Sequence, residues 1–286
     1  MLAQVNLTPT ESKKLIAKAI ASLDMVRQAS TEGMILLHPS SSTYFIVEEI
    51  TGVKPRTNYW VCGVVAPRGM CVEMGTFVGG YSPGSLDLRE LSALWVIRNE
   101  NLSTGGTIAE YLDSMGPGDV YIKGVNALDP QGNVGILVGR SQSFGQVLSA
   151  WRRNGFKMVF PVGLEKLIPT PIKQAAKEAK RARYDYAMGM GVGLFPCPQG
   201  KTVTEVDAIE ILSGATAVPI AAGGLGGAEG SITLVIKGSE GQVKKAIDFV
   251  EQSKGARLPQ LRLCNCYQCS DPNCQFPVGG KHWVSA

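Results

Sequence analysis

Short apolar runs alternate along the chain with segments of helical periodicity. The first clear run, 34–37, has four consecutive apolar residues, which is typical of a buried strand. The segment before it repeats apolar residues at helical spacing, for example at Leu15, Ile16 and Ala19. Because this alternation continues along the chain, it predicts an α/β fold with a sheet covered by helices.

The same reading gives a set of expected elements. Strands are predicted at 34–37, 59–65, 70–73, 120–125, 134–138, 157–162, 193–197, 215–222, 231–237 and 260–264. Helices are predicted at 8–28, from 45 onward, and at 86–99, 105–115, 145–154, 203–212 and 240–252, with a basic helix within 167–187.

The order of elements changes after residue 190. There it becomes βαββαβ, the order of a ferredoxin-like unit. We therefore predict a Rossmann-like parallel-sheet domain over 1–189, a ferredoxin-like α+β domain over 190–263, and a Cys-rich tail over 264–286.

Composition limits the partners. The net charge of +4 is too small for the strong positive field of a typical phosphate-backbone binder, so nucleic acid is not the expected partner. No apolar run approaches 18 residues, and the first residues lack the pattern of a secretory signal, so we expect a cytoplasmic protein without membrane contact.

Four of the seven cysteines are clustered near the C-terminus. The proposed metal ligands are Cys264, Cys266, Cys269 and Cys274. In a reducing cytosol such thiols stay reduced or bind metal, and four of them satisfy a [4Fe–4S] cluster or, alternatively, zinc. The spacing is standard for neither, so a tail without metal stays open as well.

A hydroxyl-rich turn follows the first predicted strand. His38 and a proline lead into Ser40, Ser41, Ser42 and Thr43, after which a helix begins. Hydroxyls and free backbone N–H groups at a helix N-terminus suit an anionic group such as phosphate or carboxylate. The alternative is that Ser42 or Thr43 only caps the helix, and His38 likewise has a structural alternative.

Two segments resemble a known superfamily. MILLHPSSST (34–43) and GDVYIKGVNALDPQGNVGILVG (118–139) are similar to segments of ribose-5-phosphate isomerases, glucosamine-phosphate deaminases, CoA transferases and lactate-utilisation proteins. In the second segment the pattern of the superfamily falls on Asp119, Gly124, Asn126, Asp129, Gly132 and Asn133. The opening turn lacks the usual glycines. The resemblance implies ligand binding at Gly124, Asn126 and Asn133.

A CoA transferase uses a glutamate that attacks an acyl thioester. Glu73, followed by Gly75, Gly79 and Gly80, is similar to the glutamate and glycine-rich loop of one CoA-transferase half. A carboxylate nucleophile forms an acyl anhydride, and glycines let the backbone approach the thioester, so CoA is a possible cofactor. Because such enzymes pair two halves, this implies a homo-oligomer. The alternative is that Glu73 is an exposed strand end.

A sugar-phosphate isomerase is the other reaction class that the resemblance implies. Its acidic and basic groups would be Lys123, Asp129 and the pair Glu165-Lys166, with Asp129 as general base. Alternatively, Asp129 initiates the Asp-Pro-Gln-Gly turn.

These patterns together predict a metabolic enzyme that binds a small anionic metabolite or a CoA thioester, with Glu73, Asp129 and His38 as candidate catalytic residues. The rival hypothesis is a non-catalytic redox or regulatory protein that carries an iron–sulfur or zinc site on the same scaffold. The substrate and the reaction stay open.

Overall fold

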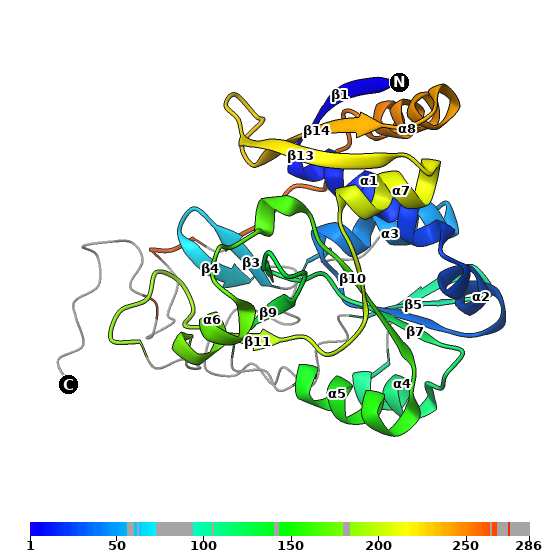
Figure 1. The fold of residues 1–286 in the computed structure, drawn as a ribbon. Coiled ribbons are helices and arrows are strands. Elements are labelled where there is room, and N and C mark those ends of the chain that lie inside the picture. Colours follow the sequence, from blue (N-terminus) through cyan, green and yellow to red (C-terminus); the bar gives the residue numbers. More distant parts are fainter. Residues whose placement is uncertain are drawn as a thin grey trace.

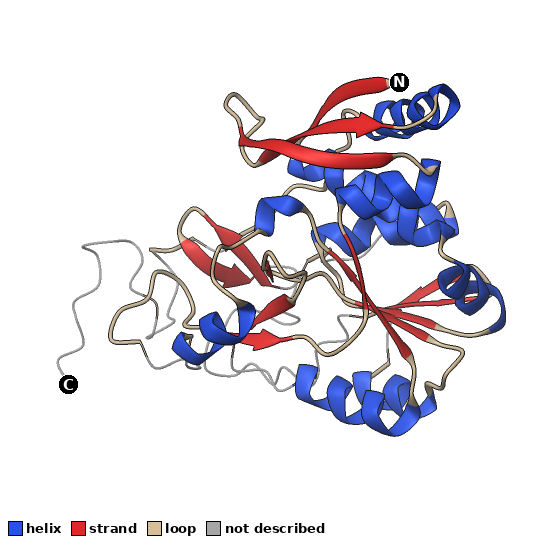
Figure 2. Cartoon of the chain, viewed as in Figure 1, coloured by secondary structure: helices blue, strands red, loops and turns tan. Residues whose placement is uncertain are grey.

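The computed structural model describes residues 1–55, 60–61, 63–72, 94–104, 106–139, 143–179, 184–263, 265–267 and 274. The strands in these ranges are β1 (Leu2–Leu7), β2 (Ile35–Leu37), β3 (Gly63–Ala66), β4 (Gly69–Val72), β5 (Trp95–Arg98), β6 (Asn101–Thr104), β7 (Val120–Ile122), β8 (Ala127–Leu128), β9 (Val134–Val138), β10 (Lys157–Pro161), β11 (Gly193–Pro196), β12 (Lys201–Val203), β13 (Thr216–Gly223) and β14 (Ser231–Lys237). The helices are α1 (Pro9–Ser22), α2 (Asp24–Glu32), α3 (Ser41–Thr51), α4 (Ile108–Ser114), α5 (Ser143–Asn154), α6 (Ile172–Glu178), α7 (Glu205–Ser213) and α8 (Glu240–Ser253). The predicted α/β class is confirmed (Figure 2).

The central sheet has six strands in the order β12-β10-β7-β2-β5-β6. The first four are mutually parallel, as the Rossmann-like prediction requires, whereas β5 and β6 continue the sheet in antiparallel pairing. The inner strands β2 and β7 are apolar and buried on both faces because helices cover both sides.

Alternate residues of these strands enter two separate cores. Leu37, Ile122 and Val159 face a core shared with α1, α2 and α3, whereas Leu36, Tyr121 and Phe160 face a second core shared with α4 and α5. Helices on opposite faces thus follow neighbouring strands, since α3 comes after β2 and α5 after the β7–β9 region.

A second sheet of three antiparallel strands, in the order β1-β14-β13, lies above the first core. In Figure 1 it forms the top of the molecule, with α1 and α7 beneath it. Leu7, Leu234 and Ile236 point from this sheet into the core that contains α1, α7 and α8. One helical layer is therefore shared by two sheets.

Two smaller sheets complete the fold. β8, β9 and β11 form one, and the hairpin of β3 and β4 forms the other. An Ala-Pro-Arg-Gly turn connects β3 to β4.

The helix predicted over 86–99 is wrong where the structure describes it. Residues 94–98 run into β5, which forms a hairpin with β6. Trp95, Val96 and Ile97 are fully buried between helices on both sides, and aromatic and β-branched residues favour a strand in such a position.

The helix predicted over 8–28 is two helices. Leu23 takes an extended conformation between α1 and α2. The predicted start of the helix at residue 8 is confirmed for α1, because Thr8 and Glu11 form a capping box and Pro9 occupies the first turn.

The βαββαβ order after residue 190 does not assemble as predicted. β11 pairs with β9, and residues 201–203, of which Val203 was the predicted helix start, form β12 on the central sheet. The strand predicted at 260–264 is absent from its described residues, 260–263, and β1 from the other end of the chain occupies the edge beside β14. Pro259, directly before the predicted strand, disfavours pairing in a sheet. The alternation of Ala3, Val5 and Leu7 instead suits a strand with one buried face.

None of the helices in the described ranges combines the length and the apolar character needed to cross a bilayer.

Candidate functional site

The carboxyl ends of four parallel strands lie along one edge of the central sheet. Leu37 on β2 pairs with Ile122 on β7, Ile122 pairs with Val159 on β10, and Pro161 at the end of β10 pairs with Val203 at the end of β12. The residues that follow these strands therefore share the edge where open α/β sheets bind their ligands. We call it the carboxyl edge.

The connections diverge between β2 and β7. The chain that leaves β2 passes through α3 on one face and returns to β5, whereas the chain that leaves β7 passes through α5 on the other face and returns to β10. Such a divergence between neighbouring parallel strands leaves a crevice at their carboxyl ends. His38 and Lys123, the first residues after β2 and β7, flank this point.

His38 is held by its backbone and its ring. Its N–H donates to the carbonyl oxygen of Ile122 at 3.4 Å, and its ring makes an edge contact with Tyr121 at 5.8 Å between centroids. Burial, and then the charge of Lys123, hold the pKa of His38 well below its ordinary value. Its Nε2 is buried and has no hydrogen-bond partner among the described atoms. The imidazole is thus neutral at pH 7.

The hydroxyl turn mainly builds the start of α3. Ser40 Oγ accepts from the N–H of Thr43 at 3.2 Å, and Thr43 Oγ1 donates to the carbonyl oxygen of His38 at 2.5 Å. Thr43 and Ser42 are buried, whereas Ser41 is half-buried. The turn therefore caps the helix, as the alternative interpretation holds. The capping residue, however, is Ser40 rather than Ser42 or Thr43.

Gly124 joins the two predicted segments. A Cβ atom added to Gly124 would lie 2.8 Å from Ser40 Oγ and 3.8 Å from Ser42 Cβ, so the absence of a side chain lets the segments touch. The hydroxyl turn and the start of the 118–139 segment thus lie side by side at the carboxyl edge.

The rest of the 118–139 segment is structural. Asp129 accepts hydrogen bonds from the N–H groups of Gln131, Asn133 and Ile172 at 2.9 to 3.0 Å, and from the amide of Asn133. These bonds, which outweigh the effect of burial, lower its pKa. Asn126 Oδ1 accepts from the N–H of Leu137. Asp129 therefore organises the turn, and the geometry gives no support to its role as a base.

A buried cluster of ionisable groups lies at the same edge, after β10 and β12. Lys13 Nζ from α1 is 2.7 Å from Glu165 Oε1, and Lys166 Nζ donates to the carbonyl oxygen of Val125 at 2.7 Å. Glu205, at the start of α7, accepts from the N–H of Leu164 through both oxygens, at 3.0 and 3.2 Å, and is fully buried.

Burial moves two of these groups toward neutrality. It raises the pKa of Glu205 to about 7. Burial, with a contribution from the charge of Lys13, lowers the pKa of Lys166 to about 8. An acid and an amine that both titrate near pH 7 to 8 are suited to proton transfer.

Sequence reasoning named Glu165 and Lys166 but missed Lys13 and Glu205. Lys13 had a signal, because it occupies the same helical stripe as Ile16 and Ile20, where a lysine is out of place. Glu205 had none, since an acidic residue in a first helical turn is ordinary.

Cys197 lies near Lys123 but is a poor nucleophile. Burial raises its pKa to about 12, so the side chain is a neutral thiol.

The cysteine cluster is described in part. Arg68, in the β3–β4 turn, donates through Nη1 to Cys266 Sγ at 2.7 Å, and Cys274 is buried. Cys264 and Cys269 lie outside the described residues, as do Glu73, Gly75, Gly79 and Gly80. Within the described part of the chain, no three His, Cys, Asp or Glu side chains are arranged to hold a metal ion.

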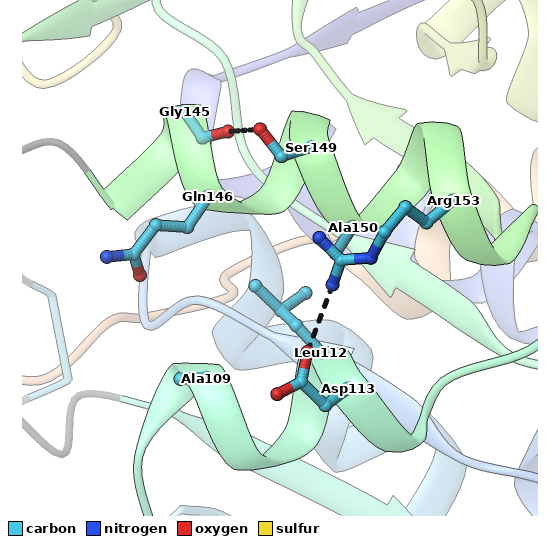
Figure 3. A pocket seen from close by; sticks show the side chains of 8 residues that line it. All are labelled: Ala109, Leu112, Asp113, Gly145, Gln146, Ser149, Ala150 and Arg153. Atoms are coloured by element: carbon cyan, nitrogen blue, oxygen red, sulfur yellow. Dashed lines mark hydrogen bonds and ion pairs between the residues drawn. The ribbon is translucent and has the colours of Figure 1, made fainter.

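A groove of about 610 Å³ runs between α4 and α5 (Figure 3). Gln146 and Ser149 line it, and an ion pair between Asp113 and Arg153 at 3.0 Å crosses one end. It shares no residue with the carboxyl edge.

No family model, curated protein or solved structure matches the chain.

Proposed function

We propose that this protein is a metabolic enzyme that binds a small anionic metabolite or a CoA thioester at the carboxyl edge of the central sheet. The observation that carries the proposal is the divergence of connections between β2 and β7, with His38 and Lys123 on either side of it. Ligands of open α/β sheets bind at such points. The resemblance of the two flanking segments to isomerases and CoA transferases is consistent with this location.

The side chains at the edge have complementary roles in the proposal. Lys123 supplies positive charge for a carboxylate or phosphate, and neutral His38 offers the buried Nε2 for a hydrogen bond. Lys166 and Glu205 hold or release a proton near neutral pH. A ligand at this edge would therefore meet an anion-binding side and a proton-transfer side.

Binding is tested by calorimetry with two probes, acetyl-CoA and ribose 5-phosphate. We expect one of them to bind, and Lys123→Met to weaken it about tenfold or more because the cation is lost. Lys173→Met is the matched control, since Lys173 is exposed on α6. Equal weakening by both variants, or no binding of either probe, would contradict the proposal.

CoA transfer has its own test. The glutamate carboxylate attacks the acyl thioester and CoA leaves as its thiolate, which gives an acyl anhydride. Hydroxylamine then attacks the glutamyl carbonyl of that anhydride, forms a glutamyl hydroxamate and releases the acyl group as a carboxylate. We expect acyl-CoA followed by hydroxylamine to inactivate the enzyme with the modification on Glu73, and Glu73→Gln to abolish transfer. Full transfer activity in Glu73→Gln would remove Glu73 as the nucleophile, and no transfer activity in the wild-type protein would remove this reaction class and leave the isomerase class.

The contact between Arg68 and Cys266 favours a second candidate function, the non-catalytic redox or regulatory protein. Hydrogen-bond donors beside a cysteine sulfur are typical of the surroundings of metal-bound thiolates. Cys266 with Cys264, Cys269 and Cys274 would hold a [4Fe–4S] cluster or zinc, and Arg68 would orient the Cys266 ligand. The tail would then serve as a redox or structural centre.

Metal analysis of anaerobically purified protein decides between the two metals. About four irons per chain with a brown colour supports the cluster, and about one zinc supports a tetrahedral site. Protein that contains neither would overturn this second candidate.

A further inference from the structure

The amine of Lys166 bonds to a backbone carbonyl instead of a carboxylate. Its Nζ donates to the carbonyl oxygen of Val125 at 2.7 Å, and it forms no ion pair with any described residue. The carboxylate of the preceding residue, Glu165, pairs with Lys13 on α1. An ammonium group has three N–H donors, so a single acceptor satisfies it poorly, whereas a neutral amine can use that bond and keep a free lone pair.

The Lys166 amine lies beside the crevice at the carboxyl edge. Val125, its acceptor, is in the loop that follows β7, two residues after Lys123 and next to Gly124, against which Ser40 packs. Because Lys166 follows β10 and bonds to this loop, its amine lies near the carboxyl ends of β7 and β10. The residue is half-buried, so it is not sealed inside the core. A ligand in the crevice would therefore have an amine at its side.

The surroundings of Lys166 favour its uncharged form. Burial, and then the charge of Lys13 on α1, lower its pKa to about 8, although Glu165 and Glu205 act in the opposite direction. About one tenth of the amine is then uncharged at pH 7, about three hundred times the fraction for an ordinary pKa of 10.5. Burial and a neighbouring cation are the two features that turn a lysine into a nucleophile.

We propose that Lys166 forms an imine with a small aldehyde or ketone that carries a carboxylate or phosphate. This inference rests on the proposed function, because it names the substrate class of the same site. Lys123 binds the anionic group, and Lys166 attacks the carbonyl carbon. Lys13 is unsuited to the attack, because Glu165 and the carbonyl oxygen of Pro9 hold its amine at 2.7 and 3.1 Å.

Imine formation needs no further reactant. The lone pair of the Lys166 amine forms the C–N bond, and both hydrogens of the amine leave with the carbonyl oxygen as water. Glu205, whose charge acts on Lys166 and whose pKa is about 7, is suited to pass these protons. The protonated imine then withdraws electrons from the neighbouring carbon, so that carbon loses a proton more readily than in the free carbonyl compound.

Borohydride reduction tests the proposal, because it converts an imine into a stable secondary amine. The wild-type protein is incubated near neutral pH with pyruvate, which carries a carboxylate, or with ribose 5-phosphate, and is then reduced. Peptide mapping by mass spectrometry locates the adduct. We expect one of the two probes to leave its reduced adduct on Lys166. The absence of an adduct with both probes, or an adduct spread over exposed lysines, would overturn the proposal.

A pair of lysine variants provides the control. Lys166→Met replaces the amine by an apolar side chain of similar length and should lower the labelling about tenfold or more. Lys157→Met should be labelled like the wild type, because Lys157 is exposed at the opposite end of β10. Equal labelling of the two variants would contradict the proposal. If circular dichroism shows that Lys166→Met is unfolded, the position of the adduct in the wild-type protein decides.

Calorimetry separates a failure of this inference from a failure of the proposed function. Binding of acetyl-CoA or ribose 5-phosphate without any adduct on Lys166 would overturn the imine and leave the binding site at the carboxyl edge in place. Protein that neither binds a probe nor forms an adduct would overturn both.

Discussion

Glu205 is fully buried and Lys166 is half-buried, and their pKa values move toward each other, to about 7 and about 8. The raised pKa of Glu205 contributes stability that is fully present below its ordinary value of 4.5 and is lost as the pH rises through 7. The lowered pKa of Lys166 contributes stability above its ordinary value of 10.5, which is lost as the pH falls through 8. Both contributions are therefore lowest between pH 7 and 8.

We predict that Glu205→Gln flattens the acidic side of the plot of unfolding free energy against pH. The wild-type protein should lose up to about 3 kcal/mol of unfolding free energy through Glu205 between about pH 5 and about pH 7.5, because the buried carboxylate becomes charged. Urea denaturation at the two pH values measures the difference. Glu210→Gln, an exposed change on the same helix, should follow the wild type. A Glu205→Gln profile identical to that of Glu210→Gln would contradict the prediction.

Asp129 gives a second prediction at this scale. Asp129→Ala leaves the N–H groups of Gln131, Asn133 and Ile172 without their acceptor, and we expect a loss of about 3 kcal/mol or more of unfolding free energy. Asp113→Ala, an exposed carboxylate in one ion pair, should cost less than about 1 kcal/mol. Chemical denaturation compares the two, and similar costs would show that the turn is not held by Asp129.

Single residues also show where sequence reasoning succeeds. The turn alternative for Asp129 follows from Asp-Pro-Gln-Gly itself, and the structure confirms it. The perturbation of Glu205 does not follow, because it depends on the packing of α7 against α1 and the β10 loop, which no local pattern specifies.

At the scale of elements, the β5–β6 hairpin explains why a helix was predicted where a strand lies. Apolar residues on both sides of a strand remove the two-residue alternation that identifies strands, and the run at 94–97 is buried on both faces. In the structure, the turn between β5 and β6 identifies the hairpin clearly. Asn99 and Glu100 take left-handed conformations there, with φ of 48° and 59°. Consecutive left-handed residues are typical of a two-residue hairpin loop.

This loop supports a prediction about side-chain type. Asn99→Val should destabilise the protein by about 1 to 3 kcal/mol, since a β-branched residue is strained at positive φ. Glu100→Gly should be tolerated, because glycine adopts this conformation readily and the N–H bond of residue 100 to the carbonyl oxygen of Ser30 is kept. Thermal denaturation ranks the variants, and a destabilising Glu100→Gly with a neutral Asn99→Val would refute the turn assignment.

At the scale of the whole molecule, the parallel half of the central sheet and its helices follow from the alternating pattern, whereas the second sheet does not. Its edge strand β1 comes from residues 2–7 and its other strands from beyond residue 215. Local patterns identify each strand, yet nothing local connects Leu7 to Ile232, so the ferredoxin-like order used the wrong edge strand.

We predict that Leu7→Ala destabilises the protein by about 2 to 5 kcal/mol, because it empties a fully buried position between β14 and α1. Leu2→Ala removes an exposed side chain of the same type on the same strand and should change stability by less than about 0.5 kcal/mol. Denaturant titrations compare them. Equal effects would mean that β1 does not close the shared core.

The pairing of β1 with β14 also sets an order of events during protein synthesis. β1 is made long before its partner, which begins at Ser231, and α7 and α8, which pack against α1, are also made late. Until then α1 is covered only on the side that packs against α3 and the central sheet, and its surface for α7 and α8 stays open, so the nascent chain is a natural client for holding chaperones over most of its translation.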